Sequence, residues 1–246
     1  MTDLLQTTDR QKITMKIAGW QKQSFIDYPG KISTVVFTQG CNFRCLYCHN
    51  SNLIPFEHNN YFSTEEVVSY CKKNAGLTDA LVITGGEPTL QPDLINFIKE
   101  IKTTGLLVKI DTNGTNFDVI KKLLDLQIID YIAMDIKTFP SLAEYKKITD
   151  NFTETHLNNI VKTIDIIKAY GNEYEFRTTV VKGIHNVETI KSIGKLIRSS
   201  QRWAIQNCRT SNTYRPMSGF PSFTEHGINV FAQIARQFVK EVNIRF

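Results

Sequence analysis

The segment Val35-Val36-Phe37-Thr38-Gln39-Gly40-Cys41-Asn42-Phe43-Arg44-Cys45-Leu46-Tyr47-Cys48-His49-Asn50 joins an apolar run to a loop that carries three cysteines. The apolar run predicts a buried strand over residues 32–38. The thiols follow it at positions i, i+4 and i+7, and on a tight loop they can converge on one polynuclear iron centre. A 4Fe–4S cubane has one iron more than Cys41, Cys45 and Cys48 can ligate, so that iron is left for a non-protein ligand.

Other uses of these cysteines remain open at this point. Thiolates also bind zinc or Cu(I), and His49 or a distant cysteine could complete a zinc tetrahedron. Five cysteines, of which three fall within eight residues, favour a metal site in a reducing compartment over a disulfide framework. Cys71 lies in a helical pattern and is expected in the core. Cys208 follows the last strand of the pattern and is read as an inert thiol, a further ligand or a substrate-facing thiol.

Outward from this loop, apolar runs alternate with helical patterns along the chain, which predicts a parallel sheet with right-handed crossovers. Six such repeats are fewer than a closed (β/α) barrel has, so a partial barrel and a doubly wound sheet both fit. Strands are expected at 32–38, 80–84, 106–110, 129–134, 174–181 and 203–206, and helices at 64–74, 93–103, 117–126, 154–170, 187–199 and 225–239.

The composition is that of one globular domain, with 41% hydrophobic and 22% charged residues among 246. We expect a single domain over 1–246, with a core at about 30–210, an N-terminal extension at 1–29 and a C-terminal helix at 224–241. The net charge of +5 is spread without a basic block, which argues against nucleic acid as a partner. No apolar run approaches the ~20 residues of a membrane span. Residues 1–10 lack the layout of a secretory signal, so a cytoplasmic location is expected.

Charged and glycine-rich motifs follow three of the predicted strands. They are Thr84-Gly85-Gly86-Glu87-Pro88, Asp111-Thr112-Asn113-Gly114 and Met134-Asp135-Ile136-Lys137. The carboxyl ends of parallel strands share one edge of a sheet, where active sites gather. Each motif also has a simpler interpretation: the first two as turns, and Asp135 with Lys137 as an ion pair. Arg177, within the fifth predicted strand, either serves the site or pairs with Glu87 or Asp135.

Together these motifs resemble the radical S-adenosylmethionine (SAM) superfamily. The CxxxCxxC spacing with Tyr47 before the last cysteine is similar to its signature, and Gly85-Gly86-Glu87 is similar to its GGE element. The resemblance implies a partial (β/α)6 TIM-like barrel whose open iron binds the amino and carboxylate groups of SAM. It also implies that Gly85, Gly86 and Glu87 meet the methionine ammonium. The resemblance also assigns further residues to cofactor binding: Tyr47, His49, Asp111, Asp135, Lys137 and Arg177. An exposed loop position is the alternative for His49.

The Asp111–Gly114 and Asp135–Lys137 motifs resemble those of glycyl-radical-enzyme activases, which implies a monovalent cation held by Asp111, Thr112 and Asp135. Residues 24–30 (Ser-Phe-Ile-Asp-Tyr-Pro-Gly) resemble the activases of anaerobic ribonucleotide reductase, and less closely the pyruvate formate-lyase activase. The resemblance covers 19–183. It implies one cluster per chain, a flavodoxin-like electron donor, and a 5′-deoxyadenosyl radical that takes hydrogen from a glycine of the reductase. The alternatives are a radical SAM enzyme for a small molecule or a peptide, and a non-enzymatic zinc or iron–sulfur module.

Overall fold

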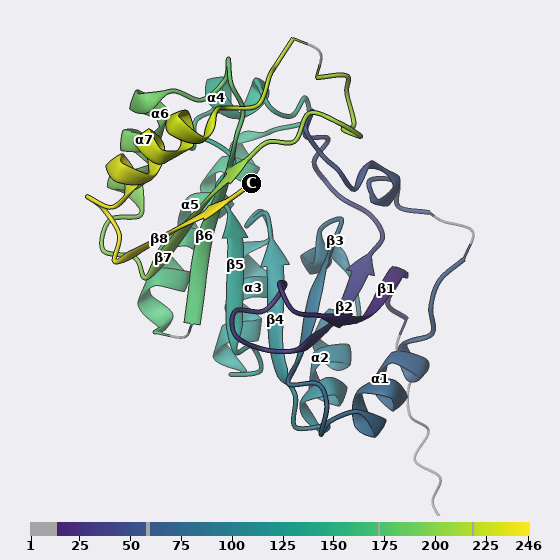
Figure 1. Cartoon of the computed structure of the whole chain (residues 1–246). Coiled ribbons are helices and arrows are strands. Elements are labelled where there is room, and N and C mark those ends of the chain that lie inside the picture. Colours follow the sequence, from purple (N-terminus) through teal and green to yellow (C-terminus); the bar gives the residue numbers. More distant parts are fainter. Residues whose placement is uncertain (1–13, 58–59, 172, 218) are drawn as a thin grey trace, which may run out of the picture.

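The computed structural model describes residues 14–57, 60–171, 173–217 and 219–246, so the segment examined for a secretory signal lies outside the described residues. One sheet of eight strands runs through them in the order β1 to β8 (Figure 1). Strands β2 to β8 are parallel, and β1 is antiparallel to β2. The strands are β1 Ile17–Ser24, β2 Ser33–Thr38, β3 Ala80–Gly85, β4 Leu107–Thr112, β5 Tyr131–Asp135, β6 Glu173–Val180, β7 Arg202–Asn207 and β8 Glu241–Arg245.

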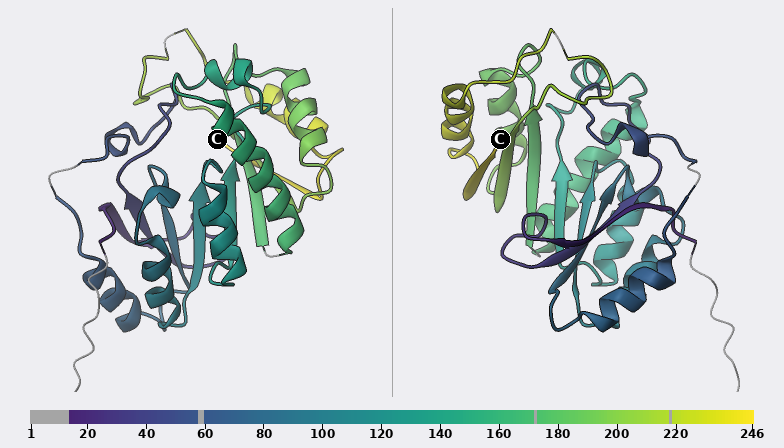
Figure 2. Two further views of the ribbon diagram at one scale, coloured as in Figure 1. Left: turned by 180° about the vertical axis from the view of Figure 1, so that it is seen from behind. Right: turned by 45° about the vertical axis from the view of Figure 1, so that its right-hand side comes forward.

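Helices cover the outer face of this curved sheet, while its inner face stays open on one side (Figures 1 and 2). The α-helices are α1 Thr64–Lys73, α2 Leu94–Lys102, α3 Phe117–Asp125, α4 Leu142–Lys146, α5 Glu154–Tyr170, α6 Val187–Leu196 and α7 Glu225–Ala235, with 3₁₀ turns η1 Ser51–Leu53 and η2 Pro88–Leu90. From β2 to β7 each strand is followed by helix, which confirms the predicted partial (β/α)6 barrel. The capping box expected at the start of α1 is present, with Ser63 and Glu66 bonded reciprocally.

The two outermost strands were not predicted. Residues 17–24 were assigned to an extension, but they form β1, with Trp20 opposite Val36 of β2. Three of the eight residues of β1 are exposed and its second half, residues 21–24, is polar, so it lacks the apolar signal of a buried strand. The last helix ends at Ala235 rather than near residue 239, and the chain then adds β8 beside β7. Only Val242 and Ile244 mark this short strand in the sequence.

Apolar side chains fill both sides of the sheet, but unequally. The larger core lies between the sheet and the helices, where fully buried side chains such as Phe97, Ile110 and Ile193 each contribute about 1.5–3 kcal/mol relative to exposure. The inner face holds a smaller cluster in which Tyr28, from the β1–β2 connection, packs on Tyr131 of β5. This smaller apolar cluster fills one end of the barrel interior, and the other end, at the carboxyl ends of the strands, is left for polar side chains.

None of the helices in the described part of the chain combines the length and the apolar character that a bilayer-spanning helix needs.

Candidate active site

A cavity of about 290 Å³ lies at the carboxyl ends of the strands, and we call it the cysteine cavity. Its lining comes from the loop after β2 and from β3, β4, β5, β6 and β7, segments that are far apart in the sequence. Among the residues that line it are all those expected from the motifs: Cys41, Cys45, Tyr47, Cys48, His49, Gly85, Gly86, Glu87, Asp111, Thr112, Asp135, Lys137 and Arg177. The parallel topology therefore brings the predicted side chains to one place.

The cysteine loop is held in shape by its own backbone and by the segment around α4. The Cys48 N–H donates to the carbonyl of Cys45 at 2.9 Å, and the Leu46 N–H donates to the carbonyl of Ile148 at 3.0 Å. Burial raises the pKa of the Cys41 thiol to about 12 and that of Cys45 to about 11, and it also raises the pKa of Cys48. Thiols in such a place are deprotonated by binding a metal rather than by solvent.

The donor set of the cysteine cavity suits an iron–sulfur cluster that carries an organic ligand. All three cysteines are free thiols on one wall, and the opposite wall is polar and charged. Tyr47 also lines the cavity, and within the described residues its buried hydroxyl has no hydrogen-bond partner. No group of three or more His, Cys, Asp or Glu side chains in the described ranges is arranged to hold a single metal ion.

Gly85 and Gly86 let the end of β3 pack closely against the end of β2 and the start of the cysteine loop. A Cβ on Gly85, whose φ is +117°, would lie 2.3 Å from the backbone N of Thr38. A Cβ on Gly86 would lie 2.1 Å from the carbonyl oxygen of Gly40. These glycines are therefore required by contact between backbones, in addition to any approach of a ligand.

The Glu87 carboxylate is fully buried and is held by four donors. Oε1 accepts from the Thr89 N–H and from the hydroxyls of Thr89 (2.6 Å) and Thr112 (2.8 Å), and Oε2 accepts from the Asn113 N–H at 2.7 Å. Burial raises the pKa of Glu87, and these hydrogen bonds oppose that shift. Asn113 also donates from Nδ2 to Asn42 Oδ1 at 2.9 Å. Asn113 therefore connects the Glu87 carboxylate to the cysteine loop.

The Asp111–Gly114 motif thus has a structural role that the sequence did not reveal. The expected Asx turn is present, because Asn113 Oδ1 accepts from the Thr115 N–H at 3.0 Å. The resemblance assigns Thr112 to the binding of a monovalent cation. In the structure, its hydroxyl donates a hydrogen bond to Glu87. The carboxylates of Asp111 and Asp135 are paired with basic side chains, so a monovalent cation there would compete with lysine and arginine; it stays a prediction.

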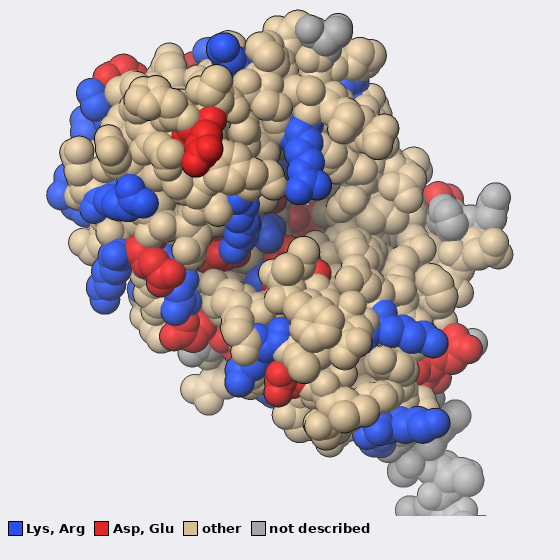
Figure 3. Space-filling view, viewed as in Figure 1, with Lys and Arg blue, Asp and Glu red and all other residues tan. Residues whose placement is uncertain are grey.

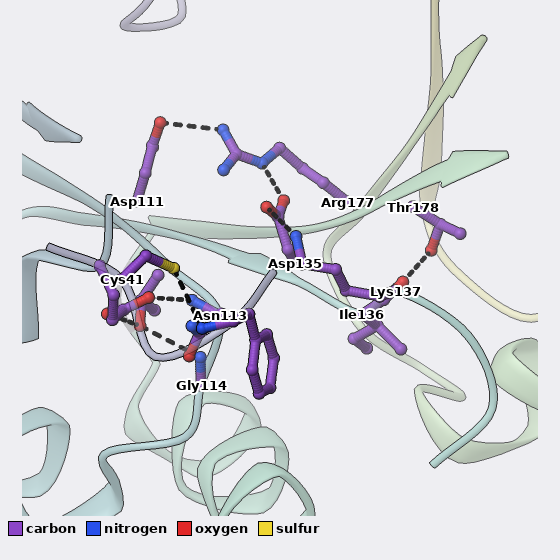
Figure 4. A network of polar contacts seen from close by, with 12 residues as sticks. Cys41, Asp111, Asn113, Gly114, Asp135, Ile136, Lys137, Arg177 and Thr178 are labelled. Carbon is purple, nitrogen blue, oxygen red and sulfur yellow. Dashed lines mark hydrogen bonds and ion pairs between the residues drawn. The ribbon is translucent and has the colours of Figure 1, made fainter. Parts of the chain in front are cut away.

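Five alternating charges form a chain across β4, β5 and β6, which we call the charge chain. Figure 4 shows its part from Asp111 through Arg177 and Asp135 to Lys137. Its ion pairs are Lys109–Asp111 (2.8 Å), Asp111–Arg177 (3.0 Å), Arg177–Asp135 (2.8 Å) and Asp135–Lys137 (3.0 Å). Burial alone would raise the pKa of each carboxyl, but Arg177 together with Lys109 or Lys137 lowers it below the ordinary range. Both acids are therefore ionised, and Arg177 pairs with Asp135 and Asp111 rather than with Glu87.

Burial bears on the remaining sequence expectations, which concern Cys71, Cys208 and His49. Cys71 is fully buried in α1, as expected for a core residue. Cys208 is buried too, and burial raises the pKa of its thiol to about 11. Both observations support the interpretation of Cys208 as an inert thiol. His49 is exposed on its loop, contacts the main-chain carbonyl of Arg209 at 3.0 Å through Nε2, and lines the cysteine cavity.

Sequence reasoning missed three side chains. Thr179 and Gln206 line the cysteine cavity, and Thr179 was detectable because it lies two residues after Arg177 on the same strand face. His185 lies behind the cavity, where its Nδ1 accepts from the Val181 N–H at 2.9 Å. Its Nε2 therefore carries the proton and donates to the carbonyl of Lys137 at 2.7 Å. No signal in the sequence points to this support of Lys137.

A second cavity, of about 680 Å³, adjoins the first, and we call it the arginine cavity. It shares His49, Arg177, Thr179 and Gln206 with the cysteine cavity and extends along the inner face toward β8. Figure 3 shows the molecule hollowed on this face, with acidic and basic side chains in the hollow and basic ones at its rim.

Comparison with known proteins gives one family. The model of the Radical SAM superfamily matches residues 35–197. A Methanocaldococcus jannaschii protein named as a candidate glycyl-radical enzyme activating enzyme is 36% identical over 232 residues, which cover 93% of this chain and 95% of that one. The pyruvate formate-lyase-activating enzyme of Clostridium pasteurianum is 28% identical over 194 residues, 72% of this chain and 80% of that one. The crystal structure of a radical SAM methyltransferase from Sphaerobacter thermophilus superimposes with a TM-score of 0.68 at 18% identity, over 91% of this chain and 68% of that one, which shows a shared fold.

Proposed function

The chain belongs to the radical SAM superfamily of enzymes, and from this we propose that it activates a glycyl radical enzyme, with anaerobic ribonucleotide reductase as the partner. The observation that carries the proposal is the end-to-end similarity to the M. jannaschii protein, which leaves 5% of that protein and 7% of this chain outside the match. The similarity to a pyruvate formate-lyase-activating enzyme supports the same class of activity.

The family implies a 4Fe–4S cluster and SAM. Cys41, Cys45 and Cys48 would hold the cluster, and Gly85, Gly86, Glu87 and the charge chain would hold SAM. When bound and reduced, the pair supplies a 5′-deoxyadenosyl radical that can remove a hydrogen atom from a glycine. The other two cysteines, Cys71 and Cys208, are buried in the core, which supports one cluster per chain.

The residues of the cavity would orient SAM by charge and by hydrogen bonds. Glu87 offers a buried carboxylate to the methionine ammonium, and its four donors hold that carboxylate in one place. Lys137, kept protonated by Asp135 against the effect of burial, which would lower its pKa, offers a cation to the methionine carboxylate. The buried side chain of Tyr47 lines the cavity and would help to exclude water from it.

The identity of the partner enzyme is the most specific part of the proposal. Residues 24–30 resemble the activases of anaerobic ribonucleotide reductase, and two of them, Ile26 and Asp27, line the arginine cavity. A flavodoxin-like protein is proposed as the electron donor. The monovalent cation at Asp111, Thr112 and Asp135 is tested by comparing turnover in potassium and in tetramethylammonium salts.

The decisive experiment mixes the reconstituted protein, SAM and dithionite with anaerobic ribonucleotide reductase and records the electron paramagnetic resonance spectrum. We expect a glycyl doublet that is lost when the target glycine is replaced by alanine. SAM cleavage without a doublet on any glycyl radical enzyme would instead support a radical SAM enzyme that acts on a small molecule or another peptide. Zinc in place of iron, with no SAM cleavage, would exclude both.

A further inference from the structure

The arginine cavity adjoins the proposed SAM site and has more than twice its volume, about 680 against 290 Å³. The boundary between the two consists of His49, Arg177, Thr179 and Gln206, which line both. A molecule in the arginine cavity therefore borders directly on the cysteine cavity.

Strand register places a row of polar side chains along this boundary. Thr179 of β6 is paired with Gln206 of β7, and Gln206 is paired with Arg245 of β8. Neighbouring strands lie about 4.8 Å apart, so the row presents a hydroxyl, an amide and a guanidinium at the spacing of successive strands. Among the described residues, the side chains of Thr179 and Gln206 have no hydrogen-bond partner, although both face the cavities.

The cations of the arginine cavity differ in how fully they are paired. Lys109 and Arg177 belong to the charge chain, and Arg245 donates to the buried carboxylate of Glu175 at 2.7 Å. Arg209 is exposed and, within the described chain, its guanidinium donates only to the main-chain oxygen of Phe246, the last residue of the sequence, at 3.0 Å. That contact sets Arg209 beside Arg245, which precedes Phe246.

We propose that the arginine cavity binds an acidic segment of the polypeptide substrate, with its carboxylate on Arg209 and Arg245 and its backbone on Thr179 and Gln206. This inference rests on the proposed function, and it adds the chemistry by which the substrate is chosen. An arginine matches a carboxylate with two parallel N–H donors, and a hydroxyl and an amide can each donate to and accept from peptide groups. A peptide entering the barrel loses water from its backbone and needs such partners.

The neutral part of the row favours a peptide over a phosphorylated small molecule. Gln206 lies between Thr179 and Arg245 in the strand register, and Arg245 does not line the cysteine cavity, so an anion on Arg245 binds outside that cavity. The only acidic side chain that lines the arginine cavity within the described residues is that of Asp27, and it already accepts a hydrogen bond from the Ser24 hydroxyl. The free donor capacity at the Arg209 end is thus cationic. At the boundary with the cysteine cavity, Arg177 is already paired with Asp111 and Asp135, and the side chains without a partner in the described chain, Thr179 and Gln206, are neutral.

The test measures peptide binding without radical chemistry. Fluorescent seven-residue peptides with a central glycine and one glutamate, placed at each other position in turn, are compared with their glutamine counterparts by anisotropy. The protein is loaded with cluster and SAM and is left unreduced. We expect at least one glutamate peptide to bind about tenfold more tightly than its glutamine counterpart, the size of one charge-assisted hydrogen bond. Arg209→Gln should remove this preference while the glutamine peptide binds as before.

Arg236→Gln is the matched control, because Arg236 is an exposed arginine at the end of α7 outside the cavity. A second variant, Arg245→Gln with Glu175→Gln, neutralises the buried pair together and should also abolish the preference. Equal affinity for acidic and neutral peptides, an undiminished preference in Arg209→Gln, or competition by GTP at the Kd of the glutamate peptide would each overturn the proposal. A glycyl radical formed without any acidic preference would refute this subsite alone, whereas an acidic preference without any glycyl radical would refute the proposed function alone.

Discussion

Replacing Asp111 by asparagine tests whether the charge chain stabilises the fold around the site. The substitution keeps the size of the side chain but removes the anion between Lys109 and Arg177. Both cations are largely buried, with 4% of the Lys109 side chain and 14% of the Arg177 side chain exposed. A buried cation that loses its anion cannot recover the lost interaction from water.

The expected cost is about 3 kcal/mol in the free energy of unfolding, at the low end of the range for a broken buried pair. The low end applies because each cation keeps one partner: Lys109 donates to the Asp27 carbonyl at 2.7 Å, and Arg177 stays paired with Asp135. For a domain of this size such a loss lowers the melting temperature by about 6–12 °C. The control is Asp125→Asn, which breaks an exposed i,i+4 pair with Lys121 and should cost about 0.3–0.5 kcal/mol.

Thermal and urea unfolding, followed by circular dichroism and by the fluorescence of the buried Trp203, measure this difference under reducing conditions. The pH dependence gives a second check. The pKa of Asp111 is lowered in the folded state, so its contribution is complete above the unfolded carboxyl pKa, about 3.9, and is lost as the pH falls below it. The penalty of Asp111→Asn should therefore shrink in acid. A penalty below about 1 kcal/mol at pH 7, or one no larger than that of Asp125→Asn, would refute the reasoning.

Three further predictions concern the site. Gly86→Ala should lower the melting temperature and the amount of iron retained, because its Cβ meets the Gly40 backbone, whereas Gly76→Ala, with open space around it, should change neither; equal behaviour in calorimetry and iron analysis would contradict this. Cys45→Ala should abolish the absorbance of the 4Fe–4S cluster after reconstitution, whereas Cys71→Ala should keep the cluster and cost about 1 kcal/mol or more of stability as a core cavity; loss of the cluster in Cys71→Ala would count against one cluster on the predicted loop. His185→Gln should weaken SAM binding about tenfold by releasing the Lys137 carbonyl, with little change in iron content; calorimetric titration with SAM that shows wild-type affinity would remove this support role.

Much of this architecture was predictable because it depends on local patterns. Apolar runs bounded by turn residues mark β2 to β7, and the rule that parallel strands share their carboxyl ends places Cys41, Glu87 and Asp135 at one cavity. The edge strands β1 and β8 escaped prediction because about half of the residues in each are polar, so neither forms an apolar run. Their pairing is decided by the neighbouring strand rather than by their own sequence.

The partners of the predicted residues were less accessible from sequence. Arg177 was expected to serve the cofactor or to pair with Glu87 or Asp135, and it pairs with Asp135 and Asp111. Choosing between such partners requires the register of β4, β5 and β6, which no local pattern encodes. His185 supports Lys137 from a loop 48 residues away, so only the folded chain reveals it.

The hydrogen bond between Asn113 and Asn42 has a thermodynamic consequence. Asn113 also holds the Glu87 carboxylate, so this bond links the surroundings of Glu87 to the cysteine loop. An ordered conformation of one therefore favours an ordered conformation of the other. Reciprocity of binding then requires that whatever factor iron adds to the affinity for a ligand on Glu87, that ligand adds to the retention of iron. A saturating concentration of that ligand should therefore slow the loss of iron from the protein to a chelator or to air.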